Sequence, residues 1–159
     1  MKITIDHREI ISLEAFELGW RFDKIHNSEI TAAEKNLITA LSPAESQRVN
    51  KIIGYYENPE NRVRKYTETN WFSAHSETAE KEVRFRKKIE NYLLPYSDDL
   101  IVSWNRRTAV HTSKSIFLNY LTDFLYPSSD DVTIVSINLS WILFYDHTEV
   151  ANFWTKNEI

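Results

Sequence analysis

The segment DVTIVSINLSWILFYD, residues 131–146, contains two runs of β-branched and aromatic residues with a short link between them. Residues 132–137 and 141–145 favour strands, because such side chains pack well on a pleated surface. The link at residues 138–140 is short enough for a hairpin. The segment therefore predicts an antiparallel pair of strands.

Further elements flank this hairpin on both sides. Upstream, residues 100–104 predict another strand, and residues 112–125 predict a helix with apolar side chains at helical spacing. Downstream, Phe153 and Trp154 predict a last edge strand. The C-terminal half of the chain is therefore expected to run strand, helix, strand, strand.

Helix signals dominate the first 94 residues. Thr31 and Glu34 have the spacing of a capping box, for a helix that is expected to end near Leu41. A second start signal is Ser42-Pro43, and Asn58-Pro59 ends the helix that it begins. Residues 10–18 and 76–94 also show helical spacing of apolar residues.

The remaining stretches of this half have weaker patterns. Residues 2–5 alternate like a short strand. Residues 62–70 are polar and charged without clear periodicity, so they predict a loop or a lightly packed helix. Trp71 and Phe72 then form an apolar pair that is expected to return the chain to the core.

The order of elements indicates an α+β fold. Helices come first and a β-α-β-β half follows, so we expect N-terminal helices packed on one face of a small, mainly antiparallel sheet. At 159 residues the chain has the length of one domain. We expect a single domain over residues 1–159, with a mostly helical part at 1–94 and an acidic α/β part at 95–159.

Composition excludes several function classes. Two Gly leave no room for a Gly-rich phosphate loop or a dinucleotide fingerprint. The absence of Cys excludes disulfides, thiolate metal sites and a Cys nucleophile. No run approaches 18 apolar residues, and the first residues lack the apolar run of a signal peptide, so we expect a cytoplasmic protein without a membrane partner.

Negative charge is concentrated in the C-terminal part. Residues 95–159 carry 8 acidic and 4 basic side chains, whereas residues 1–94 carry 15 of each. We expect the acids that precede or follow the predicted strands, and one near a helix end, to form a face that binds a basic partner. An alternative is that they cap helices and turns. These candidate partner-binding residues are Asp98, Asp99, Asp123, Asp130, Asp131, Asp146 and Glu149.

Other groups suggest weaker alternatives. A small enzyme or ligand-binding domain acting on a phosphorylated small molecule would use His111, His147, Arg106 and Arg107. The sequence Asp146-His147-x-Glu149 places only two ligands on one strand face, where a catalytic zinc needs three. We therefore expect no catalytic residue, metal or cofactor.

A basic cluster lies within residues 81–88. Glutamates four residues upstream of Lys81, Arg84 and Arg86 favour ion pairs along a solvated helix face. The net charge of −4 also speaks against nucleic acid as a partner.

The C-terminal half resembles a known class of bacterial proteins. The residues that carry the likeness are YPSSDDV at 126–132 and the alternating Trp141, Leu143, Tyr145, His147 and Glu149. Over residues 99–149 the chain is similar to immunity proteins that accompany secreted toxins, as in contact-dependent growth inhibition. The resemblance implies a non-catalytic cytoplasmic antidote whose partner is a cognate protein toxin, often a nuclease with a basic active-site cleft. It assigns no role to individual residues.

Overall fold

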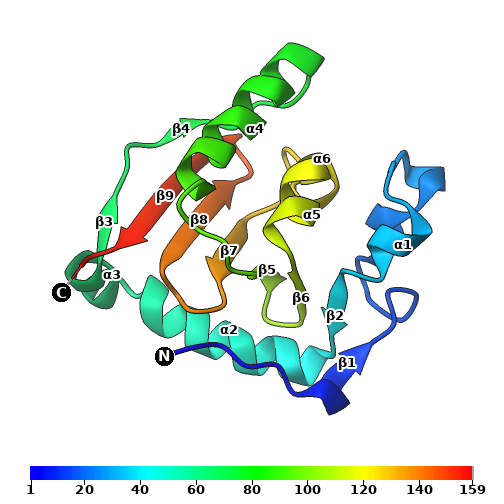
Figure 1. Cartoon of the computed structure of the whole chain (residues 1–159), viewed down its shortest axis with the longest axis horizontal. Helices are drawn as coiled ribbons and strands as arrows, with labels where there is room; N and C mark the ends of the chain where they lie inside the picture. Colours follow the sequence, from blue (N-terminus) through cyan, green and yellow to red (C-terminus); the bar gives the residue numbers. More distant parts are fainter. Residues whose placement is uncertain (159) are drawn as a thin grey trace.

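A nine-stranded antiparallel sheet forms the centre of the fold (Figure 1), in the computed structural model that describes residues 1–158. Its strand order is β1-β2-β6-β5-β7-β8-β9-β3, and β4 also pairs with β9. The strands are β1 (Ile10–Ile11), β2 (Thr39–Leu41), β3 (Tyr66–Glu68), β4 (Phe72–Ser73), β5 (Leu100–Asn105), β6 (Thr108–Thr112), β7 (Val132–Ser136), β8 (Trp141–Asp146) and β9 (Val150–Lys156).

Helices occur in both halves of the chain. The α+β class is confirmed, although the helices are not confined to the N-terminal part. Within residues 1–158, no helix has the length and apolarity needed to cross a bilayer. The helices are α1 (Ala32–Lys35), α2 (Pro43–Glu57), α3 (Pro59–Lys65), α4 (Ala79–Leu93), α5 (Lys114–Asn119) and α6 (Leu121–Phe124), with short 3₁₀ turns η1 (His7–Glu9), η2 (Gly19–Phe22) and η3 (Lys24–His26).

The predicted hairpin is confirmed as β7 and β8. In the link, the Ser136 hydroxyl accepts from the Ser140 N–H (2.8 Å), and Leu139 takes a positive φ of 58°. The predicted last strand is longer than expected. Because β9 pairs with β8 on one side and with β3 and β4 on the other, it does not form an edge of the sheet.

Several boundaries differ from the prediction. The capping box at Thr31 is present, but α1 ends at Lys35 and residues 39–41 form β2 instead. The predicted helix over residues 10–18 is wrong, since these residues form β1 and turns. Residues 2–5 are not a strand, although the Ile3 N–H donates to the carbonyl of Ile137 (2.6 Å). Residues 108–112 form β6, a strand that was not predicted.

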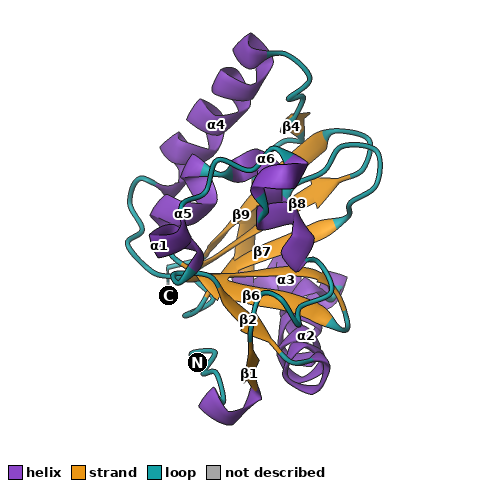
Figure 2. Ribbon diagram, turned by 90° about the vertical axis from the view of Figure 1, so that its right-hand side faces the viewer, coloured by secondary structure: helices purple, strands orange, loops and turns teal. Residues whose placement is uncertain are grey.

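Helices cover both faces of the sheet, not one as expected. Figure 2 shows α2 and α3 on one side and α4 and α5 on the other. Alternate residues of β5 divide between the two cores: Leu100 and Val102 pack with α4, α5 and α6, and Ile101 packs with α2. The central strands are therefore apolar on both faces, which requires cover on both.

A buried ion pair joins the N-terminal segment to the sheet. Arg21, in η2, donates from Nη1 and Nη2 to the two carboxylate oxygens of Asp130, at 2.5 and 2.9 Å. Asp130 also accepts from the Tyr126 N–H (2.9 Å), and the guanidinium lies 4.1 Å from the centre of the Tyr126 ring. With Asp130 only 7% exposed, its carboxylate is not part of the surface.

We expect Asp130→Ala to lower the free energy of unfolding by about 3–5 kcal/mol, because it leaves the Arg21 charge buried and unpaired. Urea denaturation measures this. Asp98→Ala is the control, because Asp98 makes no side-chain hydrogen bond or ion pair within residues 1–158. This substitution should change the free energy of unfolding by no more than about 0.5 kcal/mol. Equal losses in the two variants would contradict a structural role for the pair.

Replacement of each of the two glycines by alanine is expected to have opposite effects on stability. A Cβ on Gly19 would lie 1.8 Å from the carbonyl oxygen of Leu13, so Gly19→Ala must displace backbone and should destabilise by about 1–3 kcal/mol. Around Gly54, inside α2, nothing lies within 4 Å of the added Cβ. Gly54→Ala should therefore stabilise by about 0.5–1 kcal/mol. Paired denaturation curves test both signs, and a neutral Gly19→Ala would show that the close approach is dispensable.

Candidate functional site

One end of the sheet is left open by its helical cover and forms a hollow of about 320 Å³. The helix layer on this face passes from α2 to α3 at residue 58, and the ends of β7, β8 and β9 lie beyond it. We call this feature the Trp71 hollow. Its lining residues are Arg62, Glu68, Trp71, Asp131, Val132, Thr133, Phe144, Tyr145, Asp146, Asn152 and Trp154.

Strand register builds the floor of the hollow. Thr133 pairs with Phe144, and Phe144 pairs with Asn152, so these three side chains form one row across β7, β8 and β9. Trp154 lies on the same face of β9, opposite Glu68 of β3. Two of these four side chains are aromatic; Trp154 and Asn152 are buried, and Phe144 and Thr133 are partly exposed.

Arg62 projects over this floor from α3. Its guanidinium carbon lies 5.1 Å from the centre of the Phe144 ring and 4.5 Å from that of Trp154, the geometry of a cation–π contact. Within residues 1–158 it makes no ion pair with a carboxylate, and its Nε is buried without a hydrogen-bond partner. Its charge is balanced by rings, not by an acid in contact.

Trp71 forms the exposed wall of the hollow. The segment between β3 and β4 carries it, and the side chain is 54% exposed. The prediction that Trp71 anchors the chain in the core is therefore wrong, and its neighbour Phe72 does so instead, with its ring 5.4 Å from that of Tyr92. An exposed tryptophan beside a concave apolar floor is the typical anchor of a protein interface.

Three carboxylates surround the floor: Glu68, Asp131 and Asp146. Asp131 accepts from the His147 N–H (2.9 Å) and pairs with His147 Nδ1 (2.8 Å), and these bonds lower the pKa of Asp131 and raise that of His147. Hydrogen bonds from Thr148 lower the pKa of Asp146. The two aspartates stay ionised at neutral pH. The three acids outnumber Arg62, and His147 offsets part of the negative charge beside Asp131 and Asp146.

The other predicted acids lie elsewhere. Asp98 and Asp99 precede β5, whereas Asp131 lies beyond its far end, so about 20 Å separates them at 3.4 Å per residue. The carboxylate of Asp99 pairs with His111 (3.2 Å). Glu149 is in the β8–β9 turn beside His75 (3.3 Å). The predicted acids thus do not form a single face.

The groups of the alternative enzyme do not share a cavity. His111 lines a hollow with residues of the N-terminal segment, among them Ile3 and His7. Arg106 and Arg107 line another, beside the first turn of α2. His147 pairs with Asp131. The structure thus offers no joint phosphate pocket for these four side chains.

All three ion pairs that were predicted for the basic cluster at residues 81–88 are present, at Lys81, Arg84 and Arg86.

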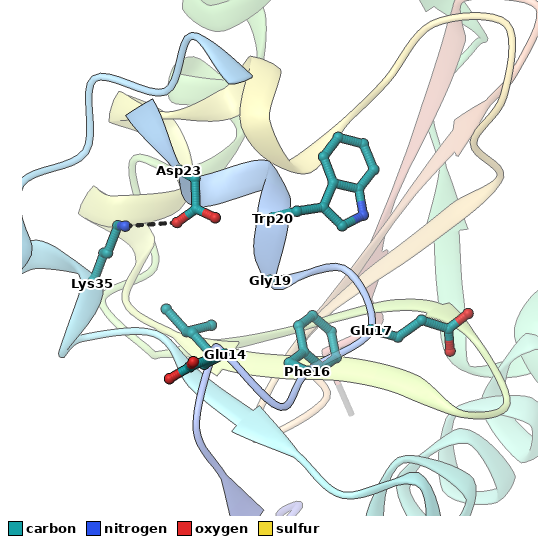
Figure 3. Close-up of a pocket in the computed structure, with 8 residues that line it drawn as sticks. Glu14, Phe16, Glu17, Gly19, Trp20, Asp23 and Lys35 are labelled. Carbon is teal, nitrogen blue, oxygen red and sulfur yellow. Dashed lines mark hydrogen bonds and ion pairs between the residues drawn. The ribbon is translucent and has the colours of Figure 1, made fainter. Parts of the chain in front are cut away.

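A larger hollow, of about 630 Å³, surrounds Gly19 (Figure 3). Its acidic groups do not converge. Asp23 is paired with Lys35 (3.0 Å), while Glu14 and Glu17 point away from one another. Trp20 packs edge-on against His26 and Tyr126, with ring centres 5.0 and 5.7 Å apart. This hollow is therefore less suited to a charged partner than the Trp71 hollow.

Asp123, the remaining predicted acid, gives a pH-dependent test. Burial raises its pKa, and its carboxylate accepts from the Ser28 hydroxyl (2.7 Å), with Glu29 and Glu82 adding negative charge nearby. The ionised form therefore destabilises the fold. We expect Asp123→Asn, which keeps the acceptor, to raise the free energy of unfolding at pH 7. The gain should vanish below about pH 3.8, where Asp123 is protonated in both states. An identical gain at pH 3 and pH 7 in urea titrations would contradict this.

The Trp71 hollow is the place where predicted acids and an exposed aromatic side chain come together. Asp131 and Asp146 were predicted from the sequence, whereas Arg62, Glu68 and Phe144 were not. No protein-family model, no curated protein and no solved structure matches the chain.

Proposed function

We propose that this protein is a non-catalytic antidote, an immunity protein of the bacterial cytoplasm that neutralises a cognate toxin domain. Its partner surface is the Trp71 hollow with its acidic rim. The observation that carries this proposal is the exposed indole of Trp71 beside an aromatic floor that three carboxylates surround. The resemblance of residues 99–149 to immunity proteins supports the same function.

Charge complementarity favours a basic partner. Glu68, Asp131 and Asp146 outnumber the one guanidinium of the hollow, and the exposed Asp131 is already ionised. A nuclease that binds the phosphate backbone presents lysines and arginines in its cleft. Such side chains fit this rim, and covering the cleft blocks access of the nucleic acid.

The two kinds of group have different roles in this complex. Carboxylates on a rim steer the approach of an oppositely charged partner, so they act mainly on the association rate and its dependence on salt. A large aromatic anchor that becomes fully desolvated acts mainly on the dissociation rate. Trp71 is expected to set the lifetime of the complex and Glu68 the rate of its formation.

Affinity capture from the native host, with tagged protein at low and high salt, tests the proposal. We expect one stoichiometric partner with a basic domain that arrests growth when produced alone and is neutralised by co-production of this protein. Trp71→Ala should weaken binding of the purified domain about 30-fold, mainly through faster dissociation, because loss of such an anchor removes about 2 kcal/mol. Glu68→Lys should slow association and flatten its salt dependence.

Glu90→Lys is the matched control, since Glu90 is exposed on α4 and makes no ion pair within residues 1–158. It changes the net charge as Glu68→Lys does, but away from the hollow. Equal effects of the two reversals would attribute binding to overall charge and reject the hollow as the interface. A captured partner that has no effect on growth would reject the antidote function.

A further inference from the structure

A second cluster of potential ligands lies on the β8–β9 turn, outside the Trp71 hollow. It joins His75, just after β4, with Glu77, just before α4, and with Glu149. His75 Nδ1 lies 3.4 Å from Oε2 of Glu77 and 3.3 Å from Oε2 of Glu149. One ligand atom from each residue lies within 4.8 Å of the other two.

Backbone pairing holds the two contributing segments together. Ser73 of β4 pairs with Val150 of β9, and the Ala74 N–H donates to the carbonyl of Glu149 (2.9 Å). His75 and Glu149 therefore lie at the end of a hydrogen-bonded pair of strands. Because the ladder fixes both backbones, the histidine and this carboxylate need little reorganisation to act together.

Nδ1 of His75 is buried without a hydrogen-bond partner, while the side chain as a whole is 43% exposed. Both neighbouring oxygens are carboxylate oxygens, and neither distance is accompanied by hydrogen-bond geometry. A cation placed between Nδ1 and the two carboxylates would bind to all three groups at once. This nitrogen is therefore an unsatisfied ligand atom directed at two further ligands.

The two separations measured from His75 Nδ1 match tetrahedral coordination. Zinc binds imidazole nitrogen at about 2.0–2.1 Å and carboxylate oxygen at about 2.0–2.2 Å, and tetrahedral angles then separate adjacent ligand atoms by roughly 3.4 Å. The two separations at His75 Nδ1 are 3.3 and 3.4 Å. Calcium takes six to eight oxygen ligands, which this cluster does not supply, and magnesium also takes oxygen ligands, whereas imidazole nitrogen is a typical ligand of zinc.

We propose that His75, Glu77 and Glu149 bind a zinc ion, with the fourth position left to water. The ion links the start of α4 to the β8–β9 turn. Glu77 pairs with Lys81 through Oε1, and its other oxygen, Oε2, faces His75. The site is independent of the proposed antidote function.

A neighbouring triad offers a matched comparison. Asp131, Asp146 and His147 also place three ligand atoms within 4.8 Å of one another. There, however, Nδ1 of His147 already forms a 2.8 Å hydrogen bond with Asp131. That nitrogen is satisfied without a metal, so His147 is the appropriate control residue.

Isothermal titration of chelator-treated protein with Zn²⁺ tests the assignment, with Mg²⁺ titrated in parallel. We expect one zinc per chain and no comparable binding of Mg²⁺. His75→Ala and Glu149→Gln should each weaken zinc binding at least about 10-fold, since even groups that only support ligands contribute that much. His147→Ala should bind zinc like the parent protein.

Thermal melting gives a second readout that needs no toxin partner. Saturating zinc should raise the melting temperature of the parent and of His147→Ala, but not that of His75→Ala. Absence of stoichiometric zinc binding would overturn the proposal. Binding lost in His147→Ala and kept in His75→Ala would overturn it as well, because it would move the ion to the other triad. Neither result affects the capture experiment at Trp71.

Discussion

The fold depends on one constraint, the burial of the central strands on both faces. Ile101, Val135 and Ile142 are fully buried on one side, and Leu100, Ile134 and Leu143 on the other. An antiparallel sheet often leaves one face to solvent, with polar residues alternating along the strands. Here that alternation is missing, so two helical layers are required. One layer contains α2 and α3, and the other contains α4 and α5.

The Trp71 hollow lies where α3 and the segment between β3 and β4 meet the strands β7, β8 and β9. Arg62 of α3 bridges the gap by lying over Phe144 and Trp154, which shields part of their apolar surface while its charge faces the rings. A carboxylate in contact with the guanidinium would compete with this arrangement. The acids instead stand at the rim, on the strand ends that the helices do not reach. The floor of the hollow thus comes from the register of β7, β8 and β9, and Asp131 and Asp146 lie at the ends of β7 and β8.

Local signals in the sequence predicted the elements that short-range chemistry controls. The capping box at Thr31, the helix start at Ser42 and the hairpin at residues 131–146 form as expected, although the helix after Thr31 ends at Lys35. Long-range effects were not accessible in the same way. Residues 39–41 look helical by spacing but pair with β6, and Asp130 looks like its neighbour Asp131 although Arg21, 109 residues away, takes it into the interior. In the candidate site, the acids Asp131 and Asp146 were predicted from the sequence. Arg62 was not, because its role depends on contacts with Phe144 and Trp154, which are distant in the sequence.

The β8–β9 turn shows why adjacent residues can serve different surfaces. Asp146, His147 and Glu149 look like one cluster in the sequence, yet Glu149 takes a positive φ of 61° and its side chain joins His75 rather than Asp131. The turn therefore borders both the Trp71 hollow, through Asp146, and the cluster proposed to bind zinc, through Glu149. An ion that fixes Glu149 to His75 restricts the backbone three residues from Asp146. Asp146 itself is already held within β8 by its pairing with Val150 and by hydrogen bonds from Thr148, so the one turn supports two surfaces that can be altered separately.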